Sequence, residues 1–158
     1  MDKHIFSVTV ENNSGVLNRI AGMFSRRGFN IDSLSVGETE DPRYSRMTIC
    51  SKGDAAVMEQ LKKQLQKLEE VISVLELTDQ DSVAREYLLI KYGCNEERRG
   101  KVIDLTGIFR ASVVDVNEDS LIAELTGTPD KIDAFIRLSI PLGVVEIVRT
   151  GMTAMKRG

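Results

Sequence analysis

The segment Glu11–Leu17 carries residue types that suit a small zwitterionic ligand. It follows an alternating apolar stretch and precedes apolar residues at helical spacing, so it should form the start of a helix. The first backbone N–H groups of a helix lack partners and carry partial positive charge, which lets them bind a carboxylate. Asn12 has donor and acceptor groups, and Gly15 leaves the backbone accessible. The segment therefore suits a binding loop, but an ordinary helix cap made by Asn13 or Ser14 fits the same residues and is the commoner arrangement.

A second polar anchor could come from Asn30, in the segment Gly28–Ile31. The alternative is a helix C-cap at Gly28 followed by a turn asparagine. Asn12 and Asn30 lie at opposite ends of a predicted helix that spans roughly 20 Å, so they cannot share one small ligand within a chain. In a two-fold dimer, the Asn12 loop of one chain would meet the Asn30 end of the other. Two pockets would then lie across the interface, as an allosteric sensor requires.

The elements that position these segments occur twice, in the order strand, helix, strand, strand, helix, strand. Strands alternate in polarity, and helices carry apolar stripes. The first half predicts strands 5–11, 30–39, 45–51 and 71–77, and helices at 15–27 and from about 53. The second half predicts strands 87–92, 111–116, 121–126 and 144–148, helices at 95–109 and from 129, and a loose tail over 151–158.

This order predicts an α+β fold of two tandem ferredoxin-like βαββαβ domains, 1–78 and 79–158, joined by the polar run 78–82. Each sheet should carry both helices on one face, which leaves the other face bare. In the first domain that face includes Ile5, Ser7 and Thr9. Because exposed sheet faces and edges invite pairing with another copy, we expect a homodimer.

The bulk composition excludes several classes of protein. The 158 residues carry a net charge of −3 with a pI near 5.3, which argues against a broad nucleic-acid surface. No apolar run is long enough to span a bilayer, and the N-terminal residues resemble no targeting signal, so we expect no membrane association and a cytoplasmic location. Cys50 and Cys94 fit no metal or redox motif and read as reduced thiols.

Catalytic chemistry has little support in the sequence. His4 is the sole histidine, so a histidine metal cluster or a Ser-His-Asp triad cannot form within one chain. The adjacent acidic pairs 69–70 and 96–97 would point in different directions on a helix, unlike a cooperating acid and base. We therefore expect no catalytic residues and no metal ligands in this chain.

Three linked motifs resemble the ACT domain of the acetolactate (acetohydroxyacid) synthase small-subunit family. They are Glu11-Asn12-x-Ser14-Gly15-Val16-Leu17, Gly28-Phe29-Asn30-Ile31-x-Ser33-Leu34 and Ser45-Arg46-Met47-Thr48-Ile49. The resemblance continues into the second half, through Ile108-Phe109-Arg110 and Leu125-Thr126-Gly127, and so covers essentially the whole chain.

The resemblance implies a regulatory subunit without an active site. Such subunits bind and activate a catalytic subunit and confer feedback inhibition by branched-chain amino acids, usually valine. The holoenzyme joins pyruvate to a 2-oxoacid on the way to valine, leucine and isoleucine. Its cofactors, thiamine diphosphate, magnesium and FAD, would belong to the catalytic subunit, with none in this chain.

By position, the resemblance implies an effector site shared by two chains. One chain would provide its loop, with the backbone near Gly15 taking the carboxylate and Leu17 touching the branched side chain. The partner would provide Asn30 for the polar head and Ile31 for the side chain. The implied residues are Asn12, Ser14, Gly15, Val16 and Leu17 from one chain and Asn30 and Ile31 from the other.

The second half differs at the equivalent loop, Tyr92–Glu97, where Glu96 and Glu97 would oppose a carboxylate. We expect no amino-acid site there; this domain would support dimerisation or contact the catalytic subunit. The main alternative function is the effector module of an amino-acid-responsive transcription regulator, which would need a helix-turn-helix or a basic arm that the sequence does not display. A free-standing small enzyme would need a convergent set of reactive groups.

Overall fold

The computed structural model describes residues 2–158, which divide into two compact units. The first unit contains the residues up to Ala84 together with Met152–Gly158, and the second contains Arg85–Gly151. Each unit has a four-stranded sheet and two helices in the order βαββαβ, so the predicted α+β fold is confirmed.

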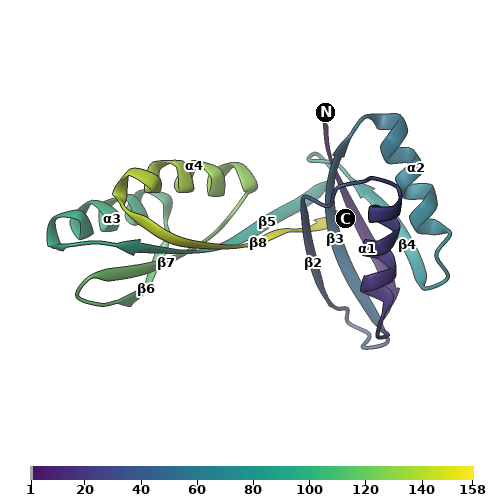
Figure 1. The fold of residues 1–158 in the computed structure, drawn as a ribbon, viewed down its shortest axis with the longest axis horizontal. Coiled ribbons are helices and arrows are strands. Elements are labelled where there is room, and N and C mark those ends of the chain that lie inside the picture. The colour runs from purple at the N-terminus through teal and green to yellow at the C-terminus, as the bar shows by residue number, and fades with distance from the viewer. Residues whose placement is uncertain (1) are drawn as a thin grey trace. The chain divides into compact units, whose positions relative to one another are not determined.

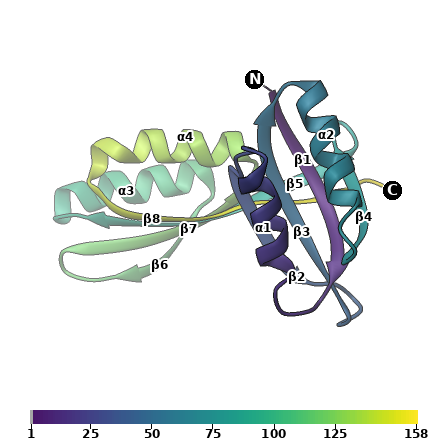
Figure 2. The ribbon, with the colours of Figure 1, turned by 45° about the vertical axis from the view of Figure 1, so that its right-hand side comes forward.

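In the first unit the strand order is β2-β3-β1-β4, with antiparallel pairing of β1 to β3 and β4 and of β2 to β3. Both helices lie on one face of this sheet (Figures 1 and 2). The elements are β1 Asp2–Glu11, α1 Val16–Arg26, β2 Ser33–Glu38, β3 Tyr44–Gly53, α2 Ala55–Gln66 and β4 Val71–Leu77.

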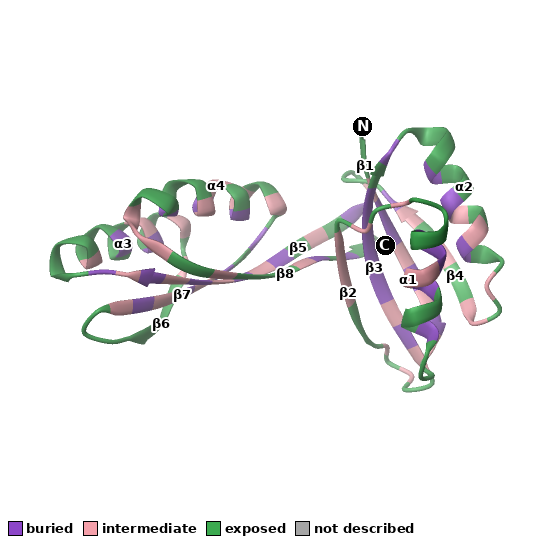
Figure 3. Cartoon of the chain, viewed as in Figure 1, coloured by how far each residue is buried: buried purple, intermediate pink, exposed green. Residues whose placement is uncertain are grey.

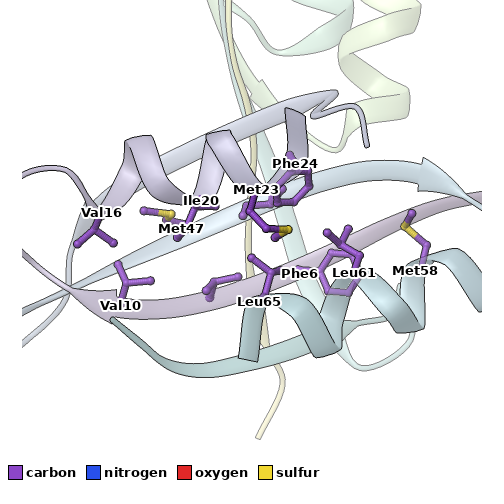
Figure 4. Packing of buried hydrophobic residues seen from close by; sticks show 12 residues of the cluster. Phe6, Val10, Val16, Ile20, Met23, Phe24, Met47, Met58, Leu61 and Leu65 are labelled. Carbon is purple, nitrogen blue, oxygen red and sulfur yellow. The ribbon is translucent and has the colours of Figure 1, made fainter. Parts of the chain in front are cut away.

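The core of the first unit lies between the sheet and its helices. Phe6, Val8 and Val10 alternate along β1 toward the helices, as the sequence pattern predicts. Figure 4 shows side chains of β1 and β3 meeting those of α1 and α2, and Figure 3 shows exposed residues on the outward sides of the same helices. This packing fixes α1, and with it the loop before α1, against the sheet.

The opposite face of the first sheet is partly covered by the C-terminal segment of the chain. Met152 and Ala154 pack with Ile5, Cys50 and Leu77 in a second buried cluster. The backbone of this segment is held by hydrogen bonds from Ser35 Oγ to the Met152 carbonyl (3.2 Å) and from the Ala154 N–H to Thr48 Oγ1 (3.3 Å). We call residues 152–157 the strap.

The strap overturns two expectations. Residues 151–158 were predicted as a loose tail, but β8 runs from Val144 to Lys156. Ile5 was expected on a bare face and is 6% exposed. The sequence signal was confined to Met152-Thr153-Ala154, a short apolar-polar alternation with the period of two of a half-buried strand, which the apolar Met155 interrupts.

The second unit repeats the arrangement with the strand order β6-β7-β5-β8. Its core joins Leu88, Ile90 and Tyr92 of β5 to Val102 and Phe135 of the helices. Both helices again lie on one face of the sheet (Figures 1 and 2). The elements are β5 Ser82–Gly93, α3 Glu96–Phe109, β6 Ser112–Val116, β7 Ser120–Gly127, α4 Pro129–Ser139, a 3-10 turn Ile140–Leu142, and β8 Val144–Lys156.

The predicted boundary at residues 78 and 79 is not a simple division of the chain. β5 begins at Ser82 within the first unit and continues into the second, and β8 returns to the first unit at Met152. The predicted linker forms a tight turn in which the Thr78 N–H and hydroxyl both donate to Asp81 Oδ1. Within residues 2–158, no helix has the length and apolar character that crossing a bilayer requires.

Candidate ligand site at the start of the first helix

The N-terminal end of α1 lacks the side-chain cap that the other α-helices have. Gly15 occupies the N-cap position with φ +88°, in the left-handed region that favours glycine, and no side chain bonds to the first turn. In contrast, Asp54, Asn95 and Thr128 each accept a hydrogen bond from a backbone N–H of the helix they precede. The alternative in which Asn13 or Ser14 caps α1 is therefore wrong.

The loop before α1 presents mostly exposed groups. Asn12, Ser14 and Gly15 are exposed, and a Cβ built on Gly15 would meet nothing within 4 Å. Leu17 is 44% exposed, so its side chain is available to a ligand. Val16 is 5% exposed and packs in the core, beside Val10 and Met47 in Figure 4, and its backbone N–H donates to the Asn13 carbonyl (3.4 Å).

A cavity of about 290 Å³ adjoins this loop on the side of β4. Arg19 lines it and forms an ion pair with Glu70, which places a charge-neutral bridge between α1 and the start of β4. The remaining lining residues are Glu11, Asn13, Ser14, Val16 and Glu69.

Asn12 is held by the β2–β3 hairpin. Its Nδ2 donates to the Pro42 carbonyl (2.9 Å) and to Glu38 Oε1 (3.3 Å), and its Oδ1 accepts from Ser45 Oγ (2.9 Å). Ser45 is 7% exposed, so its hydroxyl is a fixed donor that orients the amide. Sequence reasoning had not assigned Ser45, Pro42 or Glu38 to this site. Ser45 does stand at the head of the third motif, but the motif gave no indication of its contact with Asn12.

The tip of this hairpin is stabilised by a local charge pair. Arg43 donates to both carboxylate oxygens of Asp41, and its backbone N–H donates to Asp41 Oδ1. The side-chain bond from Arg43 is the main cause that lowers the pKa of Asp41 to about 2. The hydrogen bonds between Arg43 and Asp41 hold the turn that carries the Pro42 carbonyl.

Asn30 and Ile31 lie at the far end of α1. Gly28 follows the C-cap with φ +71°, as predicted, and Asn30 Nδ2 donates to Asp32 Oδ1 (2.6 Å). Ile31 packs at the edge of the first core. Since α1 contains 11 residues, its ends are separated by about 16 Å. One chain thus brings together Asn12, Ser14, Gly15, Val16 and Leu17, but not Asn30 and Ile31.

The equivalent loop of the second unit has a different arrangement. Asn95 Oδ1 accepts from the Arg98 N–H (2.9 Å), and Glu96 and Glu97 occupy the first turn of α3. The helix start is thus capped and acidic, which disfavours a carboxylate ligand. This contrast supports the expectation that the ligand site is confined to the first unit.

His4 serves the sheet rather than a reactive site. Its Nδ1 lies 2.7 Å from Glu76 Oε1 on the neighbouring strand β4. Over residues 2–158, no three His, Cys, Asp or Glu side chains are grouped as a metal site would need.

Two protein-family models match this chain, one in each half. A model described as "AHAS small subunit-like ACT domain" matches residues 6–73. A second model, described as "Small subunit of acetolactate synthase", matches residues 85–158. The two matches occupy the first and second βαββαβ repeats in turn.

Individual proteins agree with these models. A probable acetolactate synthase small subunit from Archaeoglobus fulgidus is 54% identical over 156 residues, covering 99% of this chain and 98% of that protein. The acetolactate synthase small subunit of Mycolicibacterium smegmatis is 46% identical over 155 residues, covering 98% and 91%. The crystal structure of the small subunit from Thermotoga maritima is 41% identical, with a TM-score of 0.93 and coverage of 100% and 99%.

Proposed function

Because this chain belongs to the acetolactate synthase small-subunit family and carries that family's ACT domain, we propose that it binds a branched-chain amino acid, with valine the preferred ligand, and regulates a catalytic subunit. Small subunits of this name are non-catalytic partners. The proposal assigns thiamine diphosphate, magnesium and FAD to the catalytic subunit. It also makes the chain an activator of that subunit and the carrier of feedback inhibition, in the cytoplasm.

One observation carries the ligand proposal: the exposed α1 N-terminus at Gly15 has no side-chain cap. Free N–H groups at a helix start attract a carboxylate, and at Gly15 no Cβ restricts its approach. Leu17, exposed beside them, offers apolar contact for a branched side chain. Asn12, whose Nδ2 already donates to Pro42 and Glu38, would meet the polar head group through Oδ1, and Asn30 of the partner would supply the other hydrogen bond to it.

The rest of the site comes from a partner chain under this proposal. Asn30 and Ile31 are about 16 Å from the loop along α1, too far for a valine-sized ligand to touch both ends. A two-fold homodimer through the first unit would bring the Asn30 end of one chain to the Asn12 loop of the other. Ligand binding would then depend on the dimer, and the geometry of the dimer on ligand.

The direct test is isothermal titration calorimetry with valine, leucine and isoleucine. We expect valine to bind the unmodified chain and Asn12→Ala to weaken that binding about five- to thirtyfold, since the loss of a polar contact to the ligand costs about 1–2 kcal/mol. Asn95→Ala is the matched control, because it removes the same residue type at the start of α3 and should leave binding unchanged. No heat with any of the three amino acids would overturn the sensor proposal.

A mixing experiment tests the two-chain site. The variants Asn12→Ala and Asn30→Ala should each bind poorly alone. After exchange of an equimolar mixture, half of the dimers are hybrid and each contains one intact site, so about one quarter of all sites should recover. A mixture that binds no better than its components would contradict a site shared between chains.

Regulation is measured separately. Adding the chain to its catalytic subunit should raise acetolactate formation, and valine should then lower it. Unchanged turnover on addition of the chain would count against the role as activator, even if valine binding is intact.

A further inference from the structure

A cavity of about 440 Å³ lies along α2 in the first unit, and we call it the α2 groove. Its charged lining residues are Arg27, which follows α1, and Lys63 and Lys67 of α2 and its end. The remaining lining residues are the glutamines Gln60, Gln64 and Gln66. Among the described residues, the lining thus has three cations and no carboxylate, although the whole chain carries a net charge of −3.

The three cations are not neutralised within the chain. Over residues 2–158, none of them forms an ion pair. Lys63 and Lys67 are four residues apart, so their side chains leave α2 on the same face. Arg27 and Lys67 each follow the last residue of a helix, where a cation offsets the partial negative charge of the helix end. That explains why each helix ends in a cation, but not why cations from two helices line one cavity.

A small anion would find no fixed backbone donor in the α2 groove. The N–H groups of Arg27 and Lys67 are bonded to carbonyls of their own helices, and those within α2 belong to the helix ladder. The described lining also has no aromatic side chain on which a nucleobase could stack. The α2 groove therefore offers the ends of long side chains, which suit an extended acidic surface better than a small phosphate-bearing ligand.

We propose that the α2 groove binds an acidic segment of the catalytic subunit. This rests on the proposed function, because the name of a small subunit implies a catalytic partner. The three cations would face carboxylates of that segment, and the glutamine amides, which donate and accept, would bond to its backbone. The α2 groove shares no residue with the implied effector site, so effector and catalytic subunit can occupy the same chain.

Association of the full chain with its catalytic subunit, measured by biolayer interferometry at low ionic strength, tests the proposal. Lys63→Glu combined with Lys67→Glu should weaken association at least about tenfold, because two attractive contacts become repulsive. Lys52→Glu combined with Lys101→Glu is the matched control, since both lysines are exposed outside the α2 groove and the net charge changes equally. The control should associate as the unmodified chain does. Added salt should weaken the unmodified chain more than the Lys63→Glu, Lys67→Glu variant.

Valine calorimetry separates this proposal from the one on which it rests. The Lys63→Glu, Lys67→Glu variant should keep its circular dichroism and bind valine as the unmodified chain does. If the unmodified chain does not associate with the catalytic subunit, the regulatory function and the α2 groove proposal both fail. If it associates but the two double variants associate equally, the α2 groove proposal alone fails. Binding of tripolyphosphate to the free chain that is lost in the Lys63→Glu, Lys67→Glu variant would also overturn it, since the α2 groove would then be a small-anion site.

Discussion

At the residue scale, the core of the second unit contains two polar side chains, Tyr92 and Ser139, that hydrogen-bond to each other. The Tyr92 hydroxyl and Ser139 Oγ are 2.8 Å apart, and both residues are 0% exposed. Burial raises the pKa of Tyr92 above its ordinary value of 10.0. Sequence patterning predicted Tyr92 in a strand and a helix from residue 129, but no pattern could pair Tyr92 with Ser139, which lies far away in the chain.

Removing one partner of this pair should lower the free energy of unfolding more than removing both. Tyr92→Phe leaves the buried Ser139 hydroxyl without its partner, and we expect the free energy of unfolding to fall by about 1–2 kcal/mol. Adding Ser139→Ala should recover part of that loss, because an apolar pair has no unmet hydrogen bond. Urea unfolding of Tyr92→Phe, Ser139→Ala and the double variant checks this. If the losses of the two single variants simply add in the double variant, the two groups do not interact.

Because of Tyr92, we expect the folded chain to lose stability at alkaline pH. Because the pKa of Tyr92 is raised in the folded chain, the unfolded chain loses that proton first as pH rises. The contribution of Tyr92 is therefore complete below pH 10 and declines above it. Tyr92→Phe should show a shallower decline, measured by urea midpoints across this range.

At the element scale, three of the four α-helices start with a side-chain cap and α1 does not. Asp54, Asn95 and Thr128 cap their helices, and each is a residue type that favours this position. The start of α1 has equally good capping residues, Asn13 and Ser14, yet neither is used. Local residue types cannot reveal this, because it depends on the φ of Gly15.

Substitutions at these helix starts should separate the two kinds. Asn95→Ala should lower the free energy of unfolding by about 1 kcal/mol, the usual worth of a cap. Ser14→Ala should change it by less than about 0.5 kcal/mol, since no cap is lost. Equal losses from both would mean that Ser14 does cap α1 in solution.

The strap is the element that sequence reasoning missed most clearly. Its apolar residues, Met152, Ala154 and Met155, are few and follow a glycine, so composition alone suggested a tail. Their meaning depends on Ile5, Cys50 and Leu77, which are brought to the same face only by the folded sheet. The order of strands and helices in the sequence therefore predicted the fold, but it did not predict that the strap covers the outer face of the first sheet.

Placing a charge in the strap should destabilise the first unit. Ala154→Asp puts a carboxylate where the side chain is 5% exposed, and we expect a loss of about 2–4 kcal/mol in the free energy of unfolding. Met155→Asp, on the next residue and 66% exposed, is the matched control and should cost less than about 0.5 kcal/mol. Similar losses from both variants would show that the strap does not pack on the sheet.

At the scale of the whole molecule, the two repeats are not simply joined end to end. The first unit contributes the start of β5 and the end of β8, and the second unit lies between them in the sequence. Sequence periodicity predicted two βαββαβ repeats correctly because each repeat forms its own core. It could not predict that the last residues of the second repeat return to the first sheet.

This arrangement has a consequence for the order of folding. Docking the strap before the second unit has formed would close a flexible loop of residues 85–151, at an entropic cost of about 4 kcal/mol. In the folded second unit the two ends of that loop are already adjacent, since Arg149 forms a double hydrogen bond with Glu86 and Thr150 Oγ1 accepts from the Tyr87 N–H. Folding of the second unit thus removes most of the closure penalty, and completion of the first unit should follow it in time.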